Sequence, residues 1–105
     1  MEQPNIDYIL KLSGGDNNFK IKMITIIKKE LPLEIDAYNR SVAQKEFKVT
    51  AECVHKLKHK IAVLGLEKSY YIAHQYEDHL LKNSSEFQTE FESTLNLMQA
   101  FVNEL

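Results

Sequence analysis

Residues 55–65 of the chain are His55-Lys56-Leu57-Lys58-His59-Lys60-Ile61-Ala62-Val63-Leu64-Gly65, the second half of its clearest helical pattern. Over the longer stretch, apolar or small side chains recur in steps of three and four: Phe47, Thr50, Val54, Leu57, Ile61 and Leu64. Such a spacing places them along one side of an α-helix. We therefore predict a helix over about residues 46–64 that packs through this stripe. Gly65 fits the position that commonly ends a helix.

Similar patterns predict two helices before this stretch. The first covers about residues 5–12 and ends at the turn 13–15, and Asp16 is a suitable N-cap for the second, which reaches about residue 43. Pro32 lies inside the second helix, where a proline removes a backbone hydrogen bond, so we expect a kink or a close restart there. The residues expected on one apolar face of its first half are Phe19, Met23, Ile26 and Ile27.

Two more helices are expected after Gly65. The fourth helix covers about residues 67–82, and its expected inward residues are Tyr70, Ala73, Tyr76 and Leu80. Ser85 followed by Gln88 matches a capping box, which predicts the start of the last helix. The apolar stripe of that helix is Phe87, Phe91, Leu95, Met98, Phe101 and Leu105.

The pattern is helical throughout, with no strand-like alternation. Because short loops join the long helices, sequential neighbours should be antiparallel. The predicted fold class is all-α, an antiparallel up-down four-helix bundle with a short extra N-terminal helix. The chain has 105 residues, a length typical of one domain, so we assign residues 1–105 to a single domain.

Charge is spread unevenly along the chain. The net charge is −2, which argues against a general nucleic-acid binder. Residues 45–68 carry six lysines against three glutamates, whereas residues 77–105 carry six acidic residues against one lysine. The basic excess around His55 could attract an acidic partner, or it could simply form a solvated helix face.

No signal peptide or membrane-spanning run is apparent in the sequence. The densest apolar stretch, residues 23–27, is far shorter than the roughly 20 residues that a transmembrane helix needs. Cys53 is the single cysteine, so no intrachain disulfide can form. We expect a cytoplasmic protein, a monomer that contacts neither membrane nor nucleic acid.

Two histidines occupy the polar side of the predicted third helix. On a helical wheel His55 lies roughly 140° from the centre of the apolar stripe, and His59 lies nearly opposite that centre. Both side chains should therefore be exposed, while Lys58 flanks the stripe one turn from His55. A histidine imidazole is partly neutral at physiological pH and then offers a nucleophilic nitrogen. Lysine side chains nearby would attract a phosphoryl group bound to that nitrogen.

The segment resembles the motif of histidine-containing phosphotransfer (HPt) domains, H-x-L-K-G followed by five residues and a glycine. The matching residues are His55, Leu57, Lys58, Leu64 and Gly65, and residues 12–16 resemble the turn that the family often has between its first helices. Glu77 falls where the family often has a polar side chain facing the phosphorylated histidine. The resemblance covers nearly the whole chain.

The resemblance implies a phosphorelay intermediate of two-component signal transduction, without catalytic activity or a cofactor of its own. His55 would accept a phosphoryl group from the aspartyl phosphate of a response-regulator receiver domain, fed by a hybrid sensor histidine kinase, and pass it to another receiver. Lys58 and Glu77 would stabilise the phosphoryl group, and Ala62 and Val63 would form part of the docking patch.

The chain departs from the family at His59, where the usual residue is glycine. An imidazole there could crowd the approach of a receiver, or it could donate a hydrogen bond to the phosphoryl oxygens. The sequence leaves both alternatives open.

Three rival interpretations remain. The two histidines could bind a metal together with Glu52 or Glu77, but no convincing four-ligand set accompanies them, so we expect no metal. A histidine-kinase dimerisation segment usually has an acidic residue after its histidine, whereas this chain has Lys56. An HPt-like adapter that binds signalling partners without phosphotransfer is the main alternative function.

Overall fold

The computed structural model describes residues 2–105, and these form five α-helices and no strand. The helices are α1 (Asp7–Ser13), α2 (Asn17–Ala43), α3 (Phe47–Val63), α4 (Glu67–Leu80) and α5 (Gln88–Asn103). The all-helical prediction is therefore confirmed. No helix among the described residues is long and apolar enough to cross a membrane.

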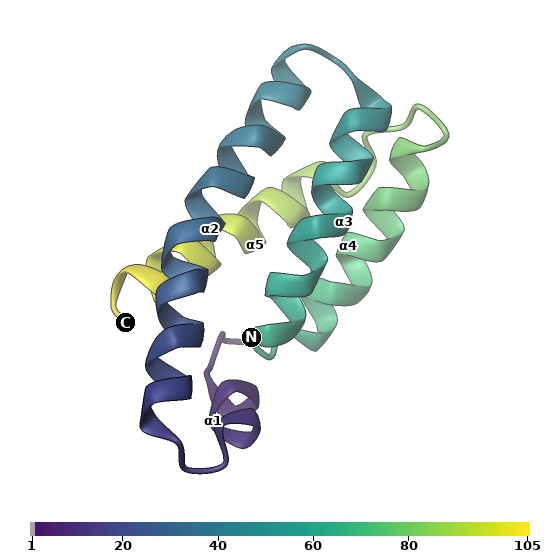
Figure 1. The fold of residues 1–105 in the computed structure, drawn as a ribbon. Helices are drawn as coiled ribbons and strands as arrows, with labels where there is room; N and C mark the ends of the chain where they lie inside the picture. The colour runs from purple at the N-terminus through teal and green to yellow at the C-terminus, as the bar shows by residue number, and fades with distance from the viewer. Residues whose placement is uncertain (1) are drawn as a thin grey trace.

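The four longer helices surround a common core. Helix α3 packs against both α2 and α4, and α5 contacts α2 and α4, while the short α1 packs against α2 near its start (Figure 1). Successive long helices reverse their direction, so α3 runs opposite to α2 and to α4 (Figure 1).

Helix α2 begins and continues largely as its sequence predicts. The Asp16 side chain accepts a hydrogen bond from the backbone N–H of Phe19 at 3.1 Å, which confirms Asp16 as the N-cap. The helix then runs without a break through Pro32 to Ala43. Leu31, next to the proline, is completely buried, so packing of this turn compensates for the hydrogen bond that proline cannot make.

The stripe predicted for α3 forms the centre of the core. Thr50, Val54, Leu57 and Ile61 are buried, as is Leu64 just after the helix, and Phe47 is half-buried. The fully buried large side chains that surround them include Leu31, Tyr38, Tyr76, Phe91 and Met98.

Some predicted core positions lie at the surface instead. Phe19 and Ile26 on α2 are more than 40% exposed, because the buried line of that helix runs through Ile27, Leu31 and Tyr38. Tyr70 on α4 is 40% exposed, since Leu66 occupies the inward position at that end of the helix.

The start of α5 differs from the prediction. No side chain caps this helix: its N-cap residue is Phe87, in a left-handed conformation with φ of 74°. Ser85 lies two residues too early for a capping box, and only its backbone carbonyl accepts from the N–H of Gln88. Phe87 packs against the core and against the ring of His79, 5.4 Å away between centroids, and this contact determines where the helix begins.

The turn between α3 and α4 is held by the N-terminal segment. Gly65 has φ of +77°, and a Cβ built there would lie 2.7 Å from the side-chain nitrogen of Asn5. The backbone N–H of Asn5 also donates to the carbonyl of Leu64 at 2.9 Å. Gly65 is therefore required both by its backbone conformation and by this close approach.

Two polar clusters link the helices, one in the core and one near the surface. The Tyr38 hydroxyl of α2 donates to Glu92 of α5 at 2.8 Å and lies 2.9 Å from the Tyr76 hydroxyl of α4. Lys60 of α3 donates to Glu30 at 2.9 Å and to Glu34 at 3.0 Å, both on α2. These two hydrogen-bonded ion pairs raise the pKa of Lys60 against the opposing effect of its burial.

Candidate functional site

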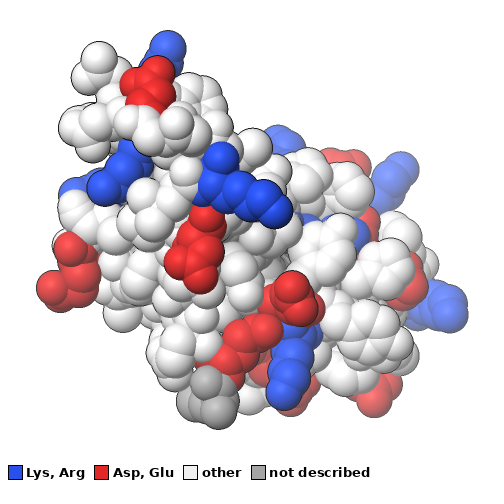
Figure 2. Space-filling model, turned by 90° about the horizontal axis from the view of Figure 1, so that it is seen from below, with Lys and Arg blue, Asp and Glu red and all other residues white. Residues whose placement is uncertain are grey.

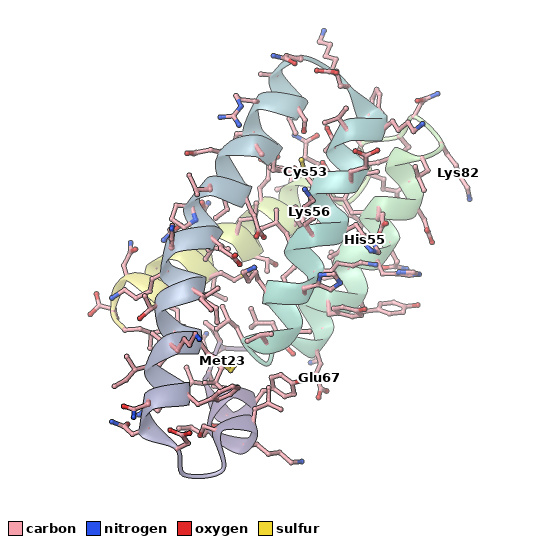
Figure 3. All side chains as sticks on the ribbon, viewed as in Figure 1. Met23, Cys53, His55, Lys56, Glu67 and Lys82 are labelled. Atoms are coloured by element: carbon pink, nitrogen blue, oxygen red, sulfur yellow. The ribbon has the colours of Figure 1, made fainter. Side chains whose placement is uncertain are left out.

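The site centres on His55, whose side chain is 58% exposed on the polar side of α3. Figure 3 shows His55 extending from α3 on the side of α4, while Cys53 lies on the side of α2. The exposure follows from the sequence, because the residues on either side of His55 in the stripe, Val54 and Leu57, are fully buried and fix the rotation of the helix.

Glu77 reaches His55 from α4. The Nδ1 atom of His55 lies 3.0 Å from Oε2 of Glu77. A carboxylate can only accept, so Nδ1 carries the hydrogen and donates it. In the neutral ring this leaves Nε2 without a proton. The contact thus selects the tautomer whose free, nucleophilic nitrogen is Nε2.

Lys58 is buried rather than projecting beside His55, with 6% of its surface exposed. Its ammonium lies 2.7 Å from Oε1 of Glu77, an ion pair placed off the hydrogen-bonding direction of that oxygen. It also donates to Nδ1 of His74 at 3.3 Å and lies 5.6 Å from the centre of the Tyr70 ring. Lys58 therefore holds Glu77 in place through one carboxylate oxygen, while His55 contacts the other.

His59 is exposed, one turn along α3 from His55. The two rings meet edge to face, with centroids 5.6 Å apart and planes inclined at 73°. His59 is thus a direct neighbour of the imidazole that Glu77 orients.

The predicted docking residues lie farther along α3. Ala62 is exposed, whereas Val63 is half-buried and packs against the core, so it offers only part of its side chain to a partner.

A pocket lies beside His55, between the first half of α3 and the end of α4. Its lining consists of Lys48, Ala51, Glu52, His55, Lys56, Glu77 and Leu81. The sequence reasoning did not select Lys48 or Leu81 for this site. The sequence spacing could have indicated Lys48, because it precedes His55 by two helical turns and so shares its face of α3. Leu81 is 61% exposed at the end of α4, and only the packing of α3 on α4 brings it near His55.

The pocket beside His55 carries several charged side chains, Lys48, Glu52, Lys56 and Glu77, and Glu77 is paired with Lys58. Among residues 2–105 no group of three or more His, Cys, Asp or Glu side chains is arranged to hold a metal ion. Seen from the end at which α1 lies, acidic and basic side chains are interspersed, and neither sign fills the visible surface (Figure 2). The site is an exposed imidazole that contacts one carboxylate, and this carboxylate is paired with a buried lysine.

Comparisons of the chain with protein-family models, with curated proteins and with solved structures find no match.

Proposed function

We propose that the protein is a histidine-containing phosphotransfer domain, a phosphorelay intermediate in which His55 is the phosphoacceptor. The observation that carries the proposal is the contact of His55 Nδ1 with Glu77, which leaves Nε2 free on an exposed side chain. In the transfer, Nε2 forms a bond to phosphorus while the bond from phosphorus to the aspartyl oxygen of a receiver domain breaks. The aspartate leaves as a carboxylate.

Glu77 supports this reaction through its contact with Nδ1 of His55, and Lys58 supports it through its ion pair with Glu77. Once Nε2 is phosphorylated and Nδ1 keeps its hydrogen, the ring is an imidazolium, and the Glu77 carboxylate stabilises its positive charge. Lys58, paired with Glu77 at 2.7 Å, holds that carboxylate in position. His59 is close enough to donate a hydrogen bond to the phosphoryl oxygens.

The arrangement of the helices supports the same proposal. Helices α2 to α5 around one core, with α1 packed against α2, agree with an antiparallel up-down bundle that has an extra N-terminal helix. We expect a cytoplasmic monomer whose partners are receiver domains and a hybrid sensor kinase. The exposed Ala62 and the edge of Val63 would belong to the docking patch, together with the pocket beside His55.

The decisive experiment mixes the protein with phosphorylated receiver domains from the same genome and locates base-stable phosphate by mass spectrometry. Label is expected on His55 and is expected to disappear in His55→Gln. His74→Gln is the matched control, since Nδ1 of His74 is occupied by Lys58 and its Nε2 faces Asp78 at 3.7 Å. This variant should still be labelled. Label on another residue, or none from any receiver, would contradict the proposal.

The alternative function is an adapter that binds signalling partners without phosphotransfer. The contact between the rings of His59 and His55 is the observation that favours it, since a receiver must approach the same nitrogen. Receiver binding without label on His55, with binding reduced by a substitution at Ala62, would support the adapter.

A further inference from the structure

The pair of His55 and His59 has the spacing of a chelate. The two residues are one helical turn apart, both are exposed, and their ring centroids are separated by 5.6 Å. Zinc binds histidine nitrogens at about 2.0–2.1 Å. Two histidines four residues apart on one helix face can bind a single zinc ion.

The hydrogen bond between His55 and Glu77 prepares the His55 ring to bind a metal ion. Histidines that bind metals usually donate their second ring N–H to a carboxylate, which fixes the tautomer and strengthens the bond to the metal. Glu77 accepts from Nδ1 of His55 in this way, at 3.0 Å, and leaves Nε2 as the ligand. The ion pair with Lys58, at 2.7 Å, holds the Glu77 side chain in position.

We propose that His55 and His59 together bind a divalent transition ion of the zinc class, with water in its remaining coordination positions. The pair supplies two protein ligands, in contrast to the four of a structural zinc site and the three of a catalytic one. Imidazole nitrogen suits zinc, copper and nickel, whereas magnesium prefers oxygen, so the pair discriminates between these ions.

The other two histidines lack this arrangement. His74 and His79 are five residues apart, and each already faces charged neighbours: His74 contacts Lys58 and Asp78, and Nδ1 of His79 lies 3.6 Å from Glu86. His79 is therefore a matched control for the loss of one histidine from the chain.

A regulatory consequence follows, and this step rests on the proposed function. The nitrogen that would accept a phosphoryl group is the same Nε2 that would bind the metal. Because one lone pair cannot serve both, zinc and the phosphoryl group exclude each other at His55. Zinc would thus withdraw the protein from the relay without unfolding it.

The first experiment measures binding of ZnCl₂ to the untagged protein by titration calorimetry, in a buffer that does not bind metal. We expect one site, affinity weakened roughly tenfold or more in His59→Gln, which leaves a single imidazole, and affinity unchanged in His79→Gln. Equal binding by His59→Gln and the unaltered protein would overturn the proposal, as would MgCl₂ binding with similar affinity. Unchanged circular dichroism establishes that both variants are folded.

The second experiment tests exclusion with phosphoramidate, a reagent that phosphorylates histidine without any receiver domain. Its P–N bond breaks, ammonia leaves, and phosphorus bonds to Nε2 of His55. Zinc is expected to suppress this label in the unaltered protein, while in His59→Gln the ratio of label with and without zinc stays near one. Suppression to the same degree in both proteins would overturn mutual exclusion. Because neither experiment uses a receiver, both remain decisive if relay transfer itself is absent.

Discussion

At the scale of the residue, Glu77 is the side chain on which the site depends. It contacts His55 with one oxygen and Lys58 with the other, and it is 17% exposed. Glu77 selects the tautomer of His55, which requires a hydrogen-bond acceptor, and it neutralises a buried lysine, which requires a negative charge. A neutral amide of the same shape could still approach His55, but it could not neutralise the ammonium.

We predict that Glu77→Gln lowers both stability and phosphoryl acceptance. Lys58 is left buried without a carboxylate, which should reduce the free energy of unfolding by about 1–3 kcal/mol. The imidazolium of phosphorylated His55 loses its counter-charge, so transfer should also slow. Urea unfolding and transfer from a phosphorylated receiver measure the two effects. Glu52→Gln, an exposed change in the same pocket, serves as control and should alter stability little.

A double variant separates the two roles of Glu77. Replacing both partners by apolar residues, Lys58→Met with Glu77→Leu, removes the unpaired charge and should recover much of the lost stability. Transfer should remain slow, because Nδ1 of His55 still lacks its acceptor. Recovery of transfer together with stability would show that Glu77 acts on His55 only by maintaining the fold.

His59 yields a second prediction at this scale. If its ring donates to the phosphoryl oxygens, phosphorylated His55 should lose its phosphate faster in His59→Ala than in the unaltered protein. The decay of the phosphorus-31 resonance of phosphohistidine at neutral pH measures this rate. A longer lifetime in His59→Ala would instead indicate that the ring crowds the phosphoryl group.

At the scale of the element, the turn between α3 and α4 depends on Gly65 and Asn5. Asn5 accepts from the N–H of Asp7 at the start of α1 and donates through its own N–H to Leu64, so it joins α1 to this turn. Gly14 provides a matched comparison, since its φ is +55° but nothing lies within 4 Å of its Cβ position.

We predict that Gly65→Ala destabilises the fold more than Gly14→Ala does. Both changes place a side chain in the left-handed region, at a cost of about 1–2 kcal/mol. Only the change at Gly65 also displaces the side chain of Asn5. In an Asn5→Gly background the additional cost of Gly65→Ala should disappear. Urea unfolding of the unaltered protein, the two single variants at Asn5 and Gly65, and their double variant measures this coupling, and Gly14→Ala gives the reference. Equal losses at both glycines would contradict the role of Asn5.

The sequence predicts best those helices in which many apolar residues follow the same helical spacing. The α3 stripe repeats over five turns, so a single exception cannot change its register, and the exposure of His55 follows from it. The capping box of α5 rested on Ser85 and Gln88 alone, and the packing of Phe87 overrode it. The approach of Glu77 to His55 is a contact between helices, which the spacing within one helix does not show, and only the family resemblance pointed to it. The burial of Lys58 could not be anticipated, because it depends on partners from α4 that satisfy the charge.

At the scale of the whole molecule, three helices meet at one buried hydroxyl. Tyr38 of α2 has a single hydrogen and donates it to Glu92 of α5, so Tyr76 of α4 donates to Tyr38. Tyr38 and Tyr76 are completely buried, and their rings pack against Phe91 with centroids 5.2 Å away. Ionisation of this network in the folded state would place negative charge in the core beside Glu92.

The network predicts a loss of stability in alkali. Burial, reinforced by the hydrogen bond that Tyr38 donates to Glu92, raises the pKa of Tyr38 far above its usual value near 10, and burial raises the pKa of Tyr76 as well. A group whose pKa is higher in the folded state stabilises the fold below its unfolded pKa and loses that contribution as pH rises. The free energy of unfolding should therefore fall above about pH 10, by up to about 1.4 kcal/mol per pH unit for each such group.

Tyr38→Phe should separate this network from other alkaline effects. The variant is expected to be less stable than the unaltered protein at pH 7, since Glu92 and Tyr76 lose a partner, yet its stability should decline less steeply between pH 9 and 11. Lys60, whose raised pKa acts in the same direction, remains in both proteins and leaves part of the slope. Tyr71→Phe, at a side chain that is 63% exposed, should keep the original slope. Urea unfolding across this range measures all three, and parallel curves for Tyr38→Phe and the unaltered protein would show that the network does not set the alkaline limit.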